Sequence, residues 1–88
     1  MSWKEYVRNF ELACSSDNTY ILTLDWSRME DALRIISKNA KEIRRVGPMI
    51  NFEYKGSKIT FFLNGKVVIK NLEDEPEHFL ENLFKERE

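Results

Sequence analysis

Two glycine-containing turns divide residues 49–71 into three short apolar runs, and they constrain the fold more than any other feature of the chain. The turns are Lys55-Gly56 and Asn64-Gly65, and glycine suits tight hairpin turns because it adopts a positive φ at little cost. Apolar and polar side chains alternate beside the turns, as is typical of strands, except that Phe62 and Val68 are apolar where the alternation calls for a polar residue. We therefore expect three consecutive antiparallel strands, at 49–54, 58–63 and 66–71.

The register of these hairpins decides which side chains share a face, because a shift of one residue moves every side chain to the opposite face. A two-residue loop at Lys55-Gly56 places Glu53 opposite Lys58, a favourable pair of opposite charges. For the second hairpin, a three-residue loop with Gly65 in a bulge separates apolar from polar side chains, whereas a two-residue loop mixes them. The bulged register gives a core face with six apolar side chains: Ile50, Phe52, Ile59, Phe61, Val67 and Ile69.

The same register turns Phe62 away from the core, onto a sheet surface that is otherwise largely polar. An apolar centre with a charged rim is typical of a protein contact site. The candidate partner-contact residues are Met49, Lys58, Phe62, Lys66, Val68 and Lys70. Two other interpretations are open: the N-terminal segment covers Phe62, or a few apolar side chains are simply exposed, as on most protein surfaces.

The N-terminal segment fits two structures. Ser2-Trp3-Lys4-Glu5 has the form of a capping box, and apolar side chains recur after it at helical spacing, which predicts a helix over residues 3–14. Phe10, Leu12 and Cys14 also alternate, as they would in a strand. Residues 20–26 alternate strictly from Tyr20 to Trp26, which predicts a strand with Leu22 and Leu24 on one face.

Two further helices are predicted around the three strands. Ser27-Arg28-Met29-Glu30 is a second capping box, and the helix that it opens runs to Val46 and ends at Gly47-Pro48. Its expected buried stripe is Met29, Ala32, Leu33, Ile36, Ala40 and Ile43. The last helix begins at Asp74-Glu75-Pro76-Glu77, with proline and carboxylates in its first turn. Its apolar face is Phe79, Leu80, Leu83 and Phe84.

The expected fold is a single α+β domain over residues 1–88, in the order α-β-α-β-β-β-α. Its helices pack mainly on one face of a small, largely antiparallel sheet. One cysteine in 88 residues excludes an internal disulfide framework and a cysteine-based zinc site. No apolar run approaches the length of a membrane span, and the N-terminus lacks the apolar segment of a signal peptide. We therefore expect a cytoplasmic protein that does not associate with membranes.

Charge is distributed unevenly along the chain. Residues 28–70 carry ten basic and four acidic side chains, whereas the segments before and after them are both net acidic. Within the long predicted helix, basic side chains form a stripe opposite the buried one: Arg34, Lys38, Lys41 and Arg45, with Arg44 beside it. Such a stripe can follow phosphates, and it is equally compatible with a solvated helix face.

Catalytic chemistry has little support in the sequence. His78 is the only histidine and lies among carboxylates in the first turn of the last helix, and Cys14 ends an apolar stripe as an expected buried side chain. No set of nucleophile, base and orienting group is visible, and no set of metal ligands converges. We expect no catalytic residues, no metal site and no cofactor.

These observations favour a small non-enzymatic interaction protein, an adaptor, accessory subunit or inhibitor. It would dock through the sheet face, either with another protein or with a second copy of itself as a homodimer. The alternative is a nucleic-acid-binding module that uses the basic segment 28–70. Salt dependence separates the two, because phosphate contacts weaken steeply with added salt and apolar docking does not.

Overall fold

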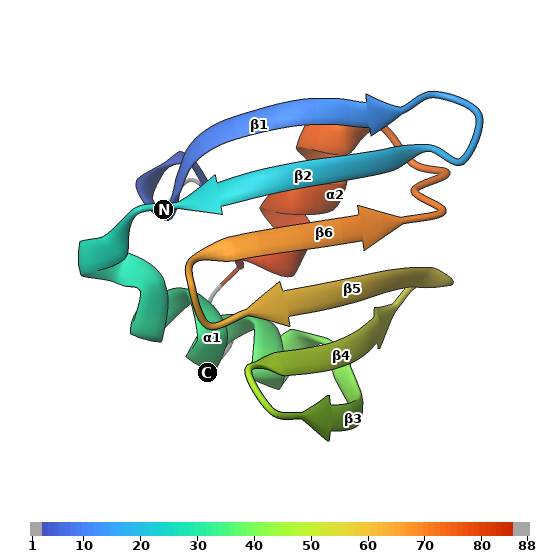
Figure 1. Ribbon diagram of the computed structural model, residues 1–88. Coiled ribbons are helices and arrows are strands. Elements are labelled where there is room, and N and C mark those ends of the chain that lie inside the picture. Colours follow the sequence, from blue (N-terminus) through green and yellow to red (C-terminus); the bar gives the residue numbers. More distant parts are fainter. Residues whose placement is uncertain (1–2, 86–88) are drawn as a thin grey trace.

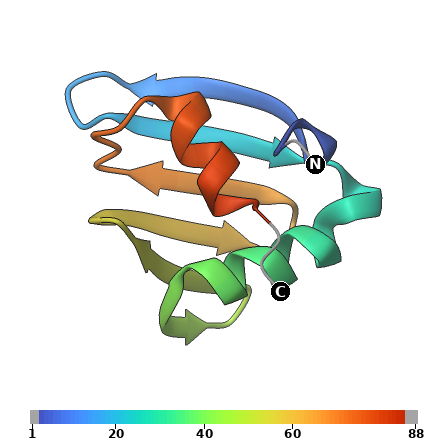
Figure 2. The same cartoon turned by 180° about the vertical axis from the view of Figure 1, so that it is seen from behind.

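The computed structural model describes residues 3–85 and shows an α+β domain built on one open, six-stranded antiparallel sheet. The strand order across the sheet is β1-β2-β6-β5-β4-β3 (Figure 1). Both α-helices lie on the same face, as the view from behind shows (Figure 2). The predicted fold class is confirmed. In chain order the elements are η1 (Trp3–Glu5), β1 (Val7–Cys14), β2 (Thr19–Leu24), η2 (Trp26–Arg28), α1 (Met29–Asn39), β3 (Lys41–Val46), β4 (Met49–Tyr54), β5 (Ser57–Phe62), β6 (Lys66–Lys70) and α2 (Pro76–Leu83).

The three-stranded unit β4-β5-β6 has the predicted register. Glu53 lies opposite Lys58, and Phe61 lies opposite Val67, as the bulged loop requires. Lys55 and Gly56 both have positive φ, at 49° and 82°, as expected for the two-residue loop of a type I′ hairpin. Gly65 has a φ of 96°, and its amide donates to the carbonyl of Phe62 at 3.0 Å. The six side chains predicted for the core face are all buried.

Residues 7–14 form strand β1, so the predicted helix over residues 3–14 is wrong and the strand alternative is confirmed. Only Trp3–Glu5 are helical, as the short 3₁₀ turn η1, and Ser2 of the predicted capping box lies outside the described residues. Phe10 packs between Trp3 and Tyr20, with ring centroids 6.0 and 5.1 Å away. As a strand, this segment pairs with the outer edge of β2. If the segment were a helix, the backbone amides and carbonyls along that edge would have no strand partner.

The helix predicted to run to Val46 ends at Asn39, and Lys41–Val46 form the edge strand β3 instead. Gly47 and Pro48 are the two-residue loop of the β3–β4 hairpin, with Val46 opposite Met49, and not the predicted helix stop. Gly47 has a φ of 56°, and glycine at the first position of such a loop is a hairpin signal as well as a helix stop signal. Ile43, predicted to be buried on the helix, is 55% exposed on β3.

The second predicted capping box does not cap α1. Asp25 Oδ1 accepts hydrogen bonds from the Ser27 amide at 3.0 Å and from the Ser27 hydroxyl at 2.8 Å, and so caps the short helix η2. The α-helix follows from Met29 without a side-chain cap. Because the chain leaves β2 at Leu24, Trp26 is not on the core face with Leu22 and Leu24, and 65% of it is exposed.

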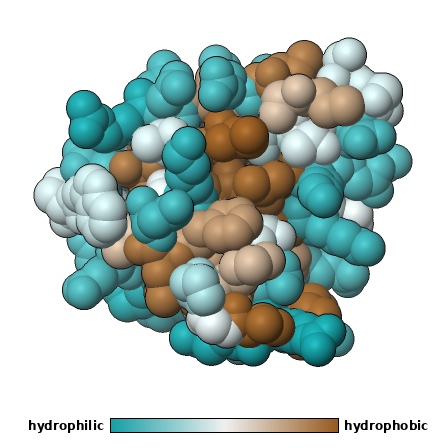
Figure 3. Space-filling model, in the orientation of Figure 1, coloured by the Kyte–Doolittle hydropathy of each residue, from teal (hydrophilic) through white to brown (hydrophobic). Residues whose placement is uncertain are grey.

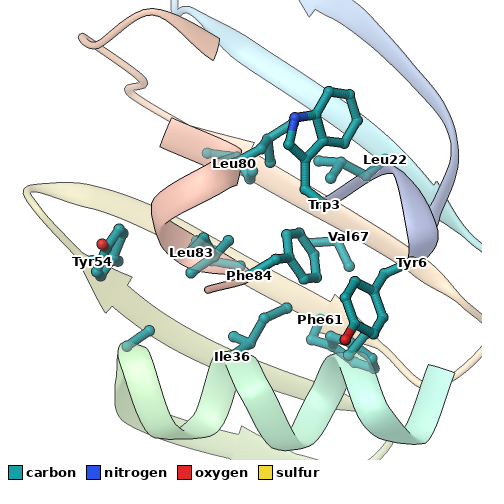
Figure 4. Packing of buried hydrophobic residues seen from close by; sticks show 14 of the residues in the cluster. Trp3, Tyr6, Leu22, Ile36, Tyr54, Phe61, Val67, Leu80, Leu83 and Phe84 are labelled. Atoms are coloured by element: carbon teal, nitrogen blue, oxygen red, sulfur yellow. The ribbon is translucent and has the colours of Figure 1, made fainter. Parts of the chain in front are cut away.

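The core lies between the sheet and the two α-helices (Figure 4). Phe61 and Val67 face Ile36 of α1 across this space, and Tyr6 stacks on Phe84 with ring centroids 5.5 Å apart. The predicted apolar face of the last helix is confirmed, since Phe79, Leu80, Leu83 and Phe84 are all buried. On α1 the predicted stripe is buried at Ala32 and Ile36, whereas Met29 and Leu33 are partly exposed.

The ends of α1 and α2 are joined by one side chain. The Nδ2 of Asn39 donates to the carbonyls of Leu83 and Lys85, each at 2.7 Å. These carbonyls lie at the end of α2 and just beyond it, where a carbonyl has no amide partner within the helix. Asn39 therefore links the C-terminal end of α1 to the C-terminal end of α2. None of the described helices is long and apolar enough to cross a membrane.

Candidate functional site

The sheet has one face covered by helices and one face, here called the open face, on which no described helix lies (Figures 1 and 2). The N-terminal segment does not cover it, because β1 is a strand of the same sheet and Trp3 and Tyr6 belong to the core. Phe62 is therefore partly exposed on the open face, and no described element lies over it. Figure 3 shows this face, with apolar side chains gathered at its centre and polar side chains around them.

Five apolar side chains form what we call the apolar band. The cross-strand pairs Ile21–Val68, Met49–Phe62 and Val46–Met49 place them on the same face. Val46, on the edge strand, is 49% exposed, and the other four are partly exposed. The apolar band thus runs obliquely from the middle of β2 and β6 to the ends of β5, β4 and β3: Ile21, Val46, Met49, Phe62 and Val68.

All six residues predicted for partner contact lie on the open face. Met49, Phe62 and Val68 are in the apolar band, and the three lysines flank it on β5 and β6. Sequence reasoning missed Ile21 because nothing local places β2 beside β6, and it missed Val46 because Gly47-Pro48 was interpreted as a helix stop. A hairpin reading of Gly47-Pro48 would have found Val46.

Basic side chains dominate the rim of the open face. By cross-strand pairing, five basic and two acidic residues point to this side. The basic residues are Lys41, Arg44, Lys58, Lys66 and Lys70, and the acidic ones are Glu11 and Glu53. Between them the Thr60 hydroxyl donates to Asn51 Oδ1 at 2.8 Å, so these two polar groups satisfy each other.

The open face has two shallow hollows at the same end, and Lys58 and Lys70 line both. One hollow is bounded by Ile43, Arg44 and Glu53 on the side of β3 and β4. The other is bounded by Ser16, Asp17, Asn18 and Asn71 on the side of the β1–β2 turn. The two lysines therefore lie between a hollow that includes the apolar side chain of Ile43 and a hollow that is lined by polar side chains.

The basic stripe predicted on one long helix does not exist as a single surface. Arg34 and Lys38 lie on α1, whereas Lys41, Arg44 and Arg45 lie on β3, because the helix ends between the two groups. Arg34 pairs with Asp31 at 3.5 Å and Arg45 with Glu42 at 3.3 Å. Only Lys41 and Arg44 contribute to the open face, and they do so as part of the sheet.

Groups with chemical reactivity lie away from the open face or at its margin. His78 Nδ1 is 2.9 Å from Asp74 Oδ2, and this contact, with the Glu75 amide, holds the pKa of Asp74 below its usual value. Cys14, expected to be buried, is partly exposed, and hydrogen bonding from the Ser16 hydroxyl at 3.1 Å lowers the pKa of its thiol. Within residues 3–85, no three His, Cys, Asp or Glu side chains converge as a metal site would require.

The fold and the open face together define a class: a small α+β domain with an open antiparallel sheet that is covered by helices on one side. No protein-family model, curated protein or solved structure matches the chain. Functional inference therefore depends on the geometry and chemistry of the open face.

Proposed function

We propose that this chain is a non-enzymatic protein-interaction domain and that the open face docks a partner protein. The observation that carries the proposal is the apolar band, which crosses the open face from β2 to β3 with a rim of charged side chains. Interfaces combine an apolar, largely uncharged centre with a polar rim in this way. The solvated face of an antiparallel sheet is usually polar, so the apolar band is the feature that distinguishes this one.

The size of the face indicates what kind of complex it supports. Six strands at ~4.8 Å spacing make a face about 24 Å wide, and strands of five to six residues are about 17–20 Å long. The projected area is then roughly 450 Å² per partner, or roughly 900 Å² in total, which is below the ~1,200–2,000 Å² of stable specific interfaces and in the range of weak, transient ones. This favours a reversible adaptor or regulatory contact over a permanent subunit interface.

Charge favours a different protein over a second copy of this chain. A two-fold pairing of open faces would bring the basic rim of one copy, centred on Lys58, Lys66 and Lys70, against the same rim of the other. Glu53 and Glu11, the two acidic residues that point to the open face, are too few to neutralise that rim. Like charges across an interface oppose binding, so a partner with an acidic rim is the better match. The single cysteine, Cys14, is compatible with the reducing cytoplasm.

Nucleic-acid binding is the second candidate function, and the five basic side chains of the open face are the observation in its favour. Sheets that bind single strands stack bases on several exposed aromatic side chains. Among the described residues of the open face, Phe62 alone is aromatic. We therefore rank this function below protein docking.

The test compares two substitutions that each place a carboxylate at an apolar position with at least partial exposure. Phe62→Asp changes the apolar band, and Leu12→Asp is the matched control, because Leu12 is 51% exposed on β1 but faces the helical side of the sheet. Immobilised wild-type and variant proteins are incubated with nuclease-treated native extract, and retained proteins are identified by mass spectrometry. Melting curves check that both variants fold.

We expect one or a few proteins to be retained by the wild type and by Leu12→Asp, and to be lost with Phe62→Asp. Their retention should change little between low and high salt, because apolar docking is weakly screened. Equal retention by both variants would refute the proposal. Retention that disappears with nuclease and falls steeply with salt would establish the nucleic-acid function instead, and sedimentation of the wild type as a dimer that Phe62→Asp dissociates would identify a second copy as the partner.

A further inference from the structure

Lys58 and Lys70 lie directly opposite each other on the open face, on neighbouring strands β5 and β6. Side chains in directly opposed positions are close enough to interact, and like charges in such a pair are destabilising. A sheet can avoid this cost by placing a neutral or acidic side chain at one of the two positions. The pairing is therefore a local concentration of positive charge that a bound anion would stabilise.

The acidic groups nearby do not neutralise this pair. Glu53 lies opposite Lys58 on the other side, and Asp17 lines the adjoining hollow. Neither lysine has an ion pair within 4.0 Å in the part of the chain that the structure describes. Glu53 also has a basic neighbour on its far side, because Lys41 lies opposite it on β3. The row from β6 to β3 thus carries three positive charges and one negative charge.

Polar side chains border the lysine pair on both sides and leave its ammonium groups accessible from solvent. Ser16, Asn18 and Asn71 border the pair on one side, in the hollow next to the β1–β2 turn. Thr60 borders it on the other side, with its hydroxyl already donated to Asn51. Both lysine side chains are exposed, so an oxyanion from solvent or from a docked molecule reaches them from above the sheet.

We propose that the Lys58–Lys70 pair is the anchor for an acidic side chain, aspartate or glutamate, of the docked protein partner. This proposal rests on the proposed function of the open face. One carboxylate placed between the two ammonium groups accepts a hydrogen bond from each, and its attraction to both offsets their mutual repulsion. A carboxylate gains more at such a pair than at an isolated lysine, because it is attracted by two positive charges at once.

The position of the pair relative to the apolar band supports an acidic protein over a phosphate backbone. Val68 is two residues before Lys70 on the same face of β6, about 7 Å along the strand. A partner surface with an apolar side chain next to a carboxylate at that spacing fits both groups at once. A nucleic-acid strand would instead need aromatic stacking beside the lysines, and Phe62 is separated from the pair by Thr60.

The test uses two acidic probes, poly-L-glutamate and an oligothymidylate of matched charge, and measures their dissociation constants at low salt. Each of three lysines is replaced by threonine, which removes one positive charge and suits a strand. Lys58→Thr and Lys70→Thr disrupt the pair. Lys66→Thr is the matched control, because Lys66 lies on the same face but opposite Thr23. Chemical shifts of the backbone amides locate each probe on the protein, and melting curves confirm folding.

We expect poly-L-glutamate to bind about fivefold more weakly to Lys58→Thr and to Lys70→Thr, and less than about twofold more weakly to Lys66→Thr. The largest shift changes should fall on β5 and β6 around the pair. Equal weakening in all three variants would mean diffuse attraction to a basic face and would overturn the proposal. Failure of poly-L-glutamate to bind the wild type, or tighter binding of oligothymidylate with shift changes centred on Phe62, would overturn it as well.

The failure of this proposal and that of the proposed function are distinguishable. If Phe62→Asp abolishes retention of the partner but the three threonine variants retain it equally, the open face docks a protein without this anchor. If the threonine variants differ as expected toward poly-L-glutamate but Phe62→Asp retains the same proteins as Leu12→Asp, the lysine pair binds carboxylates and the open face is not the docking surface.

Discussion

Phe61 and Phe62 are adjacent in the chain but lie on opposite faces of β5, and this contrast yields the sharpest test of the fold. Phe61 is 0% exposed, lies opposite Ile50 and Val67, and faces the helices. Phe62 lies opposite Met49 on the open face and is partly exposed. The same substitution at the two positions should therefore have very different costs.

Truncation of Phe61 to alanine should lower the free energy of unfolding by about 3–5 kcal/mol, because it removes a fully buried ring and leaves a cavity. Phe62→Ala should cost only about 1 kcal/mol, since part of its ring is in water in the folded protein. An 88-residue domain has a free energy of unfolding of about 4–13 kcal/mol, so Phe61→Ala would remove a large fraction of it.

Urea unfolding followed by circular dichroism measures both values, with the slope of the free energy against urea concentration expected to stay unchanged. If Phe61→Ala does not fold, Phe61→Leu provides a milder substitution, which should still cost more than Phe62→Ala. Equal costs at the two positions, or a larger cost at Phe62, would show that the strand register is shifted by one residue and that the open face has been misassigned.

Two further predictions concern the helical side of the domain. Asn39→Ala should lower the free energy of unfolding by about 1–2 kcal/mol and speed amide exchange at the end of α2, because the carbonyls of Leu83 and Lys85 lose their donor; unchanged exchange there would contradict it. The pKa of Asp74 is held below its ordinary value of 3.8, chiefly by the hydrogen bond with His78, so its contribution to stability is present above that pH and is lost as the pH falls through the lower folded value. The stability difference between the wild type and Asp74→Asn in urea unfolding should therefore be present above pH 3.8 and vanish in more acid solution, whereas a difference that does not vary with pH would refute this role.

The sequence predicted the candidate site in part. Met49, Phe62, Val68 and the three lysines follow from the register of β4, β5 and β6, which depends on turn residues and alternation within 22 residues of chain. Ile21, Arg44 and Val46 could not be placed on the same surface in this way. Their positions depend on β2 lying beside β6 and on β3 lying beside β4, and the first of these pairings joins segments more than 40 residues apart.

The sequence by itself determined the β4-β5-β6 unit and the presence of helices after Ser27 and after Glu75, because local turn chemistry and apolar periodicity point to one structure there. Only the tertiary structure decided residues 7–14, where apolar side chains fit both helical and strand spacing, and residues 41–46, which continue the helical spacing of the preceding segment but form a strand. In each case the deciding interaction is backbone pairing along the exposed edge of a strand, β2 for the first segment and β4 for the second. Such an edge exists only once the central strands have assembled, and its unpaired amides and carbonyls then favour a strand over a helix of similar propensity. The width of the open face and the extent of the apolar band are set by that step.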